Sequence, residues 1–147
     1  MMASSTEANV IFVDTSAWYA IAVADDVSHA PAMDFFKVIS SGEFGKMITT
    51  DCVLAETYTL LRIKRGTELV SHFAESVARS TNVKTLWIGE SDFSLSLEKL
   101  LKFNDKMLSF VDCSSSVAMD ALGITDVFAF DSDFKTLGYR LHPELRE

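Results

Sequence analysis

Hydrophobic and polar positions along the chain follow two alternating patterns. Short β-rich apolar runs bounded by polar residues predict strands at Val10–Val13, Met47–Thr50, Val83–Ile88, Asp126–Phe130 and, as a short last strand, Tyr139–Leu141. Longer segments between these runs carry helix-capping residues, apolar positions at helical spacing or a glycine stop. They predict a helix capped by Thr15 or Ser16 and ending at Ala24, and further helices over Ala30–Ile39, about 51–65, about Thr67–Ser80, Ser91–Phe103 and Asp112–Leu122.

Strands that alternate with helices predict an α/β fold with a mainly parallel sheet covered on both faces. We expect a single domain over residues 1–147, with residues 1–8 as a disordered N-terminal extension. Ligands of such folds bind beyond the carboxyl ends of the strands. Asp14 and Asp131 follow two of the apolar runs directly, so both are expected at this edge of the sheet.

Composition and charge narrow the class of protein. Apolar residues make up 48% of the chain, which favours a packed core, and the longest apolar run, Ala17–Ala24, is too short to span a bilayer. No signal peptide is evident at the start, so a cytoplasmic protein is expected. The net charge of −8 argues against a protein that coats nucleic acid by bulk attraction, but a nuclease with local basic groups stays open.

Four carboxylates stand out from this pattern. Asp14 and Asp131 end apolar runs, Asp112 opens a predicted helix, and Glu56 lies inside another helix among apolar neighbours. Each aspartate taken alone is explained as a helix cap or turn residue, because a carboxylate accepts the free N–H groups there. Glu56 lies inside its helix, so it cannot be a cap. The alternative to an inward-facing Glu56 is a solvent-facing side chain that pairs with nearby basic groups.

Carboxylates gathered at one edge repel one another unless a cation lies among them. Oxygen ligands without clustered histidine or cysteine suit Mg²⁺ or Mn²⁺, which phosphodiester hydrolases use to activate water. The hydroxyls of Thr15, Ser16 and Ser114 are candidates for positions near such an ion, with helix capping as the alternative.

Three segments carry a family resemblance: "VIFVDTSAWYA", "TTDCVLAETYTLL" and "LSFVDCSSSVAMDALGITDVFAFDSDF". They resemble the three acidic motifs of PIN-domain proteins and, more narrowly, of the VapC-type toxins of toxin–antitoxin pairs. The resemblance implies an α/β/α sandwich and Mg²⁺- or Mn²⁺-dependent cleavage of RNA. It further implies a homodimer and a small antitoxin partner.

Matched position by position, the resemblance assigns the metal and catalytic roles to Asp14, Glu56, Asp112 and a fourth acidic residue. The Asp-x-x-Phe pattern selects Asp131, with Phe134, for that fourth role. Asp133 is then expected in an outer shell or at the surface.

Substrate contacts are less specified by the sequence. Arg62, Lys64 and Arg65 cluster at one helix end and are candidates for RNA phosphates, with a solvated face as the alternative. Trp18 and Tyr19, near Asp14, are candidates for stacking a base, with core or dimer packing as the alternative.

Two other functions are weighed against the nuclease. A phosphoacceptor receiver domain needs an acidic pair after its first strand and a lysine after its last, whereas "VDTS" supplies one aspartate and Lys135 comes late. A PIN fold without catalysis, acting only as a binding partner, is disfavoured by the four carboxylates.

Overall fold

The computed structural model describes residues 9–104 and 106–144. Within these residues, five strands form one all-parallel sheet in the order β3–β2–β1–β4–β5. The strands are β1 (Ile11–Val13), β2 (Met47–Thr50), β3 (Val83–Leu86), β4 (Asp126–Phe128) and β5 (Arg140–His142). The expected N-terminal extension, residues 1–8, lies outside the described residues.

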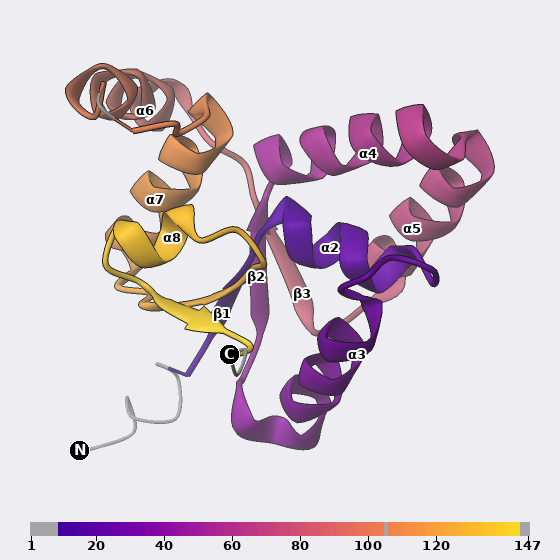
Figure 1. The fold of residues 1–147 in the computed structure, drawn as a ribbon. Coiled ribbons are helices and arrows are strands. Elements are labelled where there is room, and N and C mark those ends of the chain that lie inside the picture. The colour runs from indigo at the N-terminus through magenta and orange to yellow at the C-terminus, as the bar shows by residue number, and fades with distance from the viewer. Residues whose placement is uncertain (1–8, 105, 145–147) are drawn as a thin grey trace.

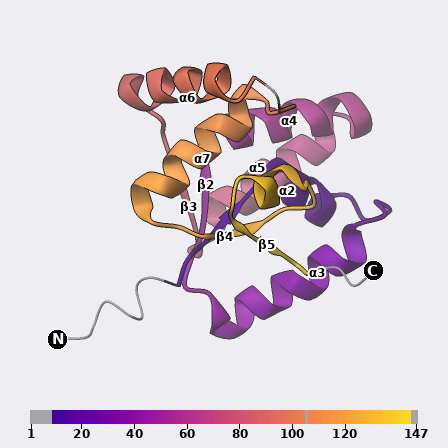
Figure 2. The same ribbon diagram turned by 60° about the vertical axis from the view of Figure 1, so that its left-hand side comes forward.

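Helices connect the strands and cover both faces of the sheet. They are α2 (Thr15–Ala22), α3 (His29–Val38, continued by a turn over Ile39–Glu43), α4 (Asp51–Arg65), α5 (Thr67–Arg79), α6 (Glu90–Lys102), α7 (Phe110–Leu122) and α8 (Asp133–Thr136). Figure 1 shows α6 and α7 on one side of the sheet and α2, α3 and α5 on the other. Figure 2, turned by 60°, brings the side with α6 and α7 toward the viewer. The three-layer α/β/α sandwich predicted from the sequence is confirmed.

The central strand is buried on both of its faces. All three residues of β1 are fully shielded from solvent, as expected for a parallel strand between two helical layers. On one side Phe35 of α3 packs edge-on against Phe128 of β4, with 4.9 Å between ring centroids. Trp18 of α2 contacts Phe73 of α5 in the same way at 5.6 Å. Burying a side chain of this size contributes about 1.5–3 kcal/mol, so these contacts fix the layers against the sheet.

Two helices, α2 and α7, begin a residue or two away from where the capping signals placed them, whereas α4 begins at Asp51 as predicted. Asp14, and not Thr15 or Ser16, caps α2, Thr50 caps α4, and Ser109 caps α7, which begins at Phe110 and not at Asp112. Each cap keeps an extended backbone and accepts a hydrogen bond from an N–H of the first turn. The short helix α8 was absent from the sequence prediction. The remaining predicted elements are present, with ends shifted by one or two residues.

The carboxyl ends of the strands bring four connections together at one edge of the sheet, which is called the carboxyl edge below. Asp14 follows β1, Asp51 follows β2, Trp87 follows β3, and the segment 129–131 follows β4. This edge carries the candidate site. Of the helices in the described ranges, none has both the length and the hydropathy needed to cross a lipid bilayer.

Candidate active site

Asp14 is the most deeply buried of the candidate carboxylates. Its side chain is only 4% exposed, and Oδ2 accepts hydrogen bonds from the Ser16 backbone N–H at 3.2 Å and from the Ser16 hydroxyl at 2.9 Å. Oδ1 is buried and has no hydrogen-bond partner among the described residues. Burial, together with the negative charge of Asp112, raises the pKa of Asp14 to about 7, although the Ser16 hydrogen bonds lower it. The unpaired oxygen is therefore an acceptor that lacks a donor or a cation.

Ser16 fixes Asp14 in place. Its hydroxyl donates to Asp14 and accepts a hydrogen bond from the backbone N–H of Phe130 at 2.9 Å. The turn after β1 is thereby tied to the segment after β4. Because Asp131 follows Phe130 directly, this bond holds the first and last acidic motifs side by side.

Asp112 occupies the third position of α7 and closes a capping box with Ser109. The Ser109 hydroxyl accepts from the Asp112 N–H at 3.0 Å, and the Asp112 carboxylate accepts from the Ser109 N–H at 3.1 Å. The residue as a whole is only 8% exposed, and burial raises the pKa of its carboxylate, helped by the charges of Asp131 and Glu56. Asp112 is thus part of a helix cap and part of an acidic cluster at the same time.

Asp131 and Asp133 both approach Asp112. Each of the three residues offers a carboxylate oxygen within 4.8 Å of the other two. The Asp133 backbone N–H donates to Asp131 at 3.0 Å, which turns the start of α8 back toward the cluster. Burial and the charges of Asp131 and Asp112 raise the pKa of Asp133. Asp133, expected in an outer shell or at the surface, therefore lies in the same cluster as Asp112 and Asp131.

Glu56 reaches the same cluster from α4. It is half-buried, and its charge contributes to the raised pKa of both Asp112 and the Cys52 thiol. It also lines a groove of about 480 Å³ with neighbours on α4 and with Val111 of α7. Glu56 is not a solvent-facing residue paired with a basic group, because no ion pair of Glu56 occurs within the described part of the chain.

Two of the candidate hydroxyls are turned to other partners. Thr15 donates to the Val53 carbonyl at 3.3 Å and accepts from the Thr57 hydroxyl at 3.2 Å, so it joins α2 to α4. Ser114 is buried and donates to the Val111 carbonyl within its own helix. Only Ser16, of the three predicted hydroxyls, hydrogen-bonds a candidate carboxylate.

The residues present fit a hard divalent cation. Asp112, Asp131 and Asp133 offer carboxylate oxygens within 4.8 Å of one another, and Asp14 and Glu56 each interact by charge with Asp112. Burial and neighbouring charges raise the pKa values of Asp14, Asp112 and Asp133, and one buried oxygen of Asp14 has no hydrogen-bond partner among the described residues. A cation would remove the repulsion and satisfy that oxygen. The set is Asp14, Glu56, Asp112, Asp131 and Asp133.

Comparison with known proteins identifies the family of this chain. Residues 11–138 match the PIN domain family. This chain belongs to the PIN-domain family. It is 32% identical over 136 residues to the 23S rRNA-specific endonuclease VapC20 of Mycobacterium tuberculosis, in the strains H37Rv and CDC 1551, covering 92% of this chain and the whole of the relative. The crystal structure of that VapC20, described as a sarcin-ricin loop cleaving toxin, superposes with a TM-score of 0.79 over 88% of this chain and 95% of that one.

The basic residues of this PIN domain are partly engaged by other groups. Arg65 forms an ion pair with Asp25 at 3.0 Å, and Lys64 lies 5.9 Å from the centre of the Tyr19 ring. Both belong to the last turn of α4, two turns or more beyond Glu56. Arg62 is exposed on the same turn. Their contact with RNA stays a prediction.

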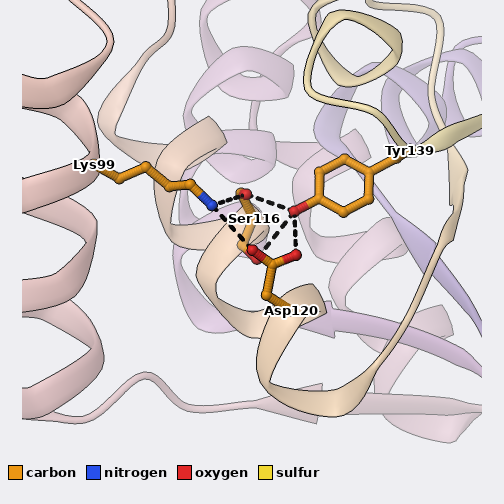
Figure 3. A network of polar contacts seen from close by, with 4 residues as sticks. All are labelled: Lys99, Ser116, Asp120 and Tyr139. Atoms are coloured by element: carbon orange, nitrogen blue, oxygen red, sulfur yellow. Dashed lines mark hydrogen bonds and ion pairs between the residues drawn. The ribbon is translucent and has the colours of Figure 1, made fainter.

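A second polar cluster lies away from the acidic residues, where α6, α7 and the turn before β5 meet (Figure 3). Lys99 of α6 pairs with Asp120 of α7 at 3.1 Å and donates to the Ser116 hydroxyl. The Tyr139 hydroxyl contacts Ser116 at 2.6 Å and donates to Asp120, also at 2.6 Å. Burial and the bond to Asp120 raise the pKa of Tyr139, so the phenol stays protonated and keeps this bond. The cluster anchors α6 to the body of the PIN domain.

Proposed function

We propose that this PIN domain is a Mg²⁺- or Mn²⁺-dependent endoribonuclease that hydrolyses RNA phosphodiester bonds and acts as the toxin of a toxin–antitoxin pair. The family membership supports a nuclease, and the relative VapC20, a 23S rRNA-specific endonuclease, supports RNA as the substrate. One observation carries the proposal: the unpaired, buried oxygen of Asp14 next to the other raised-pKa carboxylates. Such an arrangement destabilises the fold unless a cation binds there.

The proposed ligands are Asp14, Glu56, Asp112 and Asp131, with Asp133 within reach. When bound, the ion supplies Lewis-acid stabilisation of the phosphodiester and lowers the pKa of water. The chain's own contribution is positioning. Ser16 holds Asp14 through Oδ2 and leaves Oδ1 free, and the Ser109 N–H orients the carboxylate of Asp112.

The partners belong to the same proposal. The VapC-type resemblance supports a small antitoxin that binds this protein, and a homodimer as the assembled form. It also supports a cytoplasmic location, where the RNA substrate would be met. The proposed contacts for RNA phosphates are Arg62, Lys64 and Arg65. To bind a phosphate, Arg65 would have to break or share its ion pair with Asp25.

The test is cleavage of an RNA hairpin by the purified protein. Cleavage is expected with Mg²⁺ or Mn²⁺ and is expected to stop with EDTA. The Asp112→Asn variant keeps a side-chain oxygen for the Ser109 N–H but loses a charge of the cluster, and is expected to be inactive. Asp34→Asn, an exposed change on α3, is the matched control and should cut like the wild-type protein.

Full cleavage after chelation, or cleavage restored by Zn²⁺ alone, would contradict the proposed site. An RNA that is bound but never cut under any metal would favour the alternative of a PIN fold that serves only as a binding partner.

A further inference from the structure

Trp87 is the first residue after β3 at the carboxyl edge, and it is 79% exposed. Indole is the largest apolar side chain, so its exposure forgoes the stabilisation that burial would contribute. The backbone beside it is held in place, because the Ile88 N–H donates to Asp51 Oδ1 at 3.0 Å. Trp87 is therefore an exposed ring on a fixed segment of the edge that carries the acidic cluster.

The order of the strands places Trp87 near the acidic cluster. Asp51 opens α4, and its charge and that of Glu56 both act on Cys52, the next residue. Strands of one sheet lie about 4.8 Å apart, so β3 ends roughly 10 Å from β1, where Asp14 lies. An extended RNA strand with its scissile phosphate at the cluster would have a neighbouring base within reach of this ring.

A second aromatic contact lies at the start of α6 and α7. Phe93 is 54% exposed, and its ring packs on Phe110 with 4.8 Å between centroids. Phe110 is the first residue of α7, two positions before Asp112. The exposed ring of Phe93 thus packs against the first residue of α7, the helix that carries Asp112.

Charge alone is a poor source of RNA affinity for this chain. The net charge is −8, and the carboxylates of the cluster repel phosphates. Among the basic residues, Arg65 and Lys99 are already paired with aspartates. Stacking of bases on aromatic rings contributes affinity without phosphate contacts.

We propose that Trp87, with Phe93 as a second platform, stacks against unpaired bases of the RNA that reaches the acidic cluster. This inference rests on the proposed ribonuclease function and adds the side chains that hold the unpaired bases of the substrate near the cut. A base-paired helix hides its base faces and does not offer them to an indole. Because stacking supplies part of the affinity, binding depends less on salt than it would if phosphate contacts supplied all of it.

Tryptophan fluorescence tests this directly, since the chain has two tryptophans and Trp18 is only 3% exposed. The probe is an RNA hairpin with an unpaired loop, titrated in EDTA so that metal-dependent cleavage is stopped. Saturable quenching is expected for the wild-type protein and for Trp18→Phe, and is expected to be lost in Trp87→Phe. A blunt RNA duplex should leave the fluorescence unchanged.

Cleavage kinetics give the second readout. Trp87→Leu is expected to raise KM roughly tenfold with kcat nearly unchanged, within the range of one lost stacked base, and Trp87→Tyr should recover most of the loss. The matched control is Leu122→Ser, an exposed apolar residue at the opposite end of α7, which should leave KM unchanged.

The outcomes separate this inference from the function on which it rests. Quenching that needs Trp87 in a protein that cuts no RNA supports the stacking and refutes the nuclease. Normal cleavage with an unchanged KM in Trp87→Leu, and no quenching, overturns the stacking and leaves the nuclease standing. A lower molecular mass of Trp87→Leu in solution would show instead that the indole packs against another protein chain, and would overturn the inference.

Discussion

Asp14→Asn isolates the cost of a buried negative charge. Asparagine caps a helix about as well as aspartate, so the bonds from the N–H and hydroxyl of Ser16 can be kept. The variant has no charge to bury. In the metal-free wild-type protein, burial raises the pKa of Asp14 from 3.8 to about 7.

The sign of the effect follows from proton binding. Between the two pKa values the folded protein binds a proton at Asp14 and the unfolded chain does not, so stability falls as the pH rises from about 4 to about 7. A shift of this size corresponds to roughly 4 kcal/mol, at about 1.4 kcal/mol per unit. The asparagine variant lacks this loss. Its stability relative to the wild-type protein should therefore increase by up to roughly 4 kcal/mol over that interval.

The assay is urea unfolding of both proteins in metal-free buffer across this pH range, with Asp34→Asn as the exposed control. Mg²⁺ at a hundred times its dissociation constant should then stabilise the wild-type protein by about 2.7 kcal/mol and Asp14→Asn much less. A stability difference that does not change with pH would refute the reasoning, because it would show that Asp14 titrates as an ordinary exposed carboxylate.

Three further predictions concern the acidic cluster and its surroundings. Asp131→Asn should abolish RNA cleavage and Asp133→Asn should leave much of it, as the Asp-x-x-Phe register predicts; the reverse ranking in the same assay would move the fourth role to Asp133. In EDTA, Asp112→Asn should be more stable than the wild-type protein by ~1 kcal/mol, because the cluster loses one negative charge. The variant should also lose most of the stabilisation that Mg²⁺ gives the wild-type protein. Equal Mg²⁺-induced shifts of the melting temperature in the two proteins would mean that Asp112 is only a capping residue. Tyr139→Phe removes the hydroxyl that bonds Asp120 and Ser116 and should cost about 1–2 kcal/mol in urea unfolding, whereas an unchanged midpoint would show that the cluster does not anchor α6.

The fold was predictable because its signals are local. Apolar runs of strand length and capped helical segments repeat in order, and parallel strands joined by helices leave few other arrangements. The gathering of Asp14, Asp112 and Asp131 follows from the same pattern, since the segments that bear them meet where the strands end. Glu56 was predictable from its position among apolar neighbours inside a helix.

The wrong sequence predictions concern neighbouring residues that can each fill the same structural role. Asp14, Thr15 and Ser16 can each cap a helix, and in the structure Asp14 is the cap of α2. The Ser16 hydroxyl can therefore accept the hydrogen bond from the Phe130 N–H. The approach of Asp133 to Asp112 depends on the turn that its own N–H makes with Asp131. A motif with two aspartates so close together does not tell which of them faces inward.

Long-range contacts explain the rest. The pairing of Arg65 with Asp25 joins residues 40 positions apart, and no sequence pattern signals it. Trp18, a candidate for stacking a base, packs against Phe73 and donates to the Thr49 hydroxyl, so the packing alternative is the one observed. The exposed tryptophan is Trp87, whose exposure depends on how the β3–α6 connection is held by Asp51.

The central claim is that this acidic edge directs water to an RNA phosphodiester, and the most direct measurement is the chemistry of the cut ends. An RNA hairpin is cleaved with Mg²⁺ in ¹⁸O-labelled water, and the fragments are weighed by mass spectrometry. The fragments are expected to carry one ¹⁸O atom on the terminal phosphate and no 2′,3′-cyclic phosphate, and Asp14→Asn is expected not to cleave the hairpin. Fragments that end in a cyclic phosphate, or that carry no ¹⁸O, would show that the ribose 2′-hydroxyl and not water attacks the phosphorus, and would contradict it.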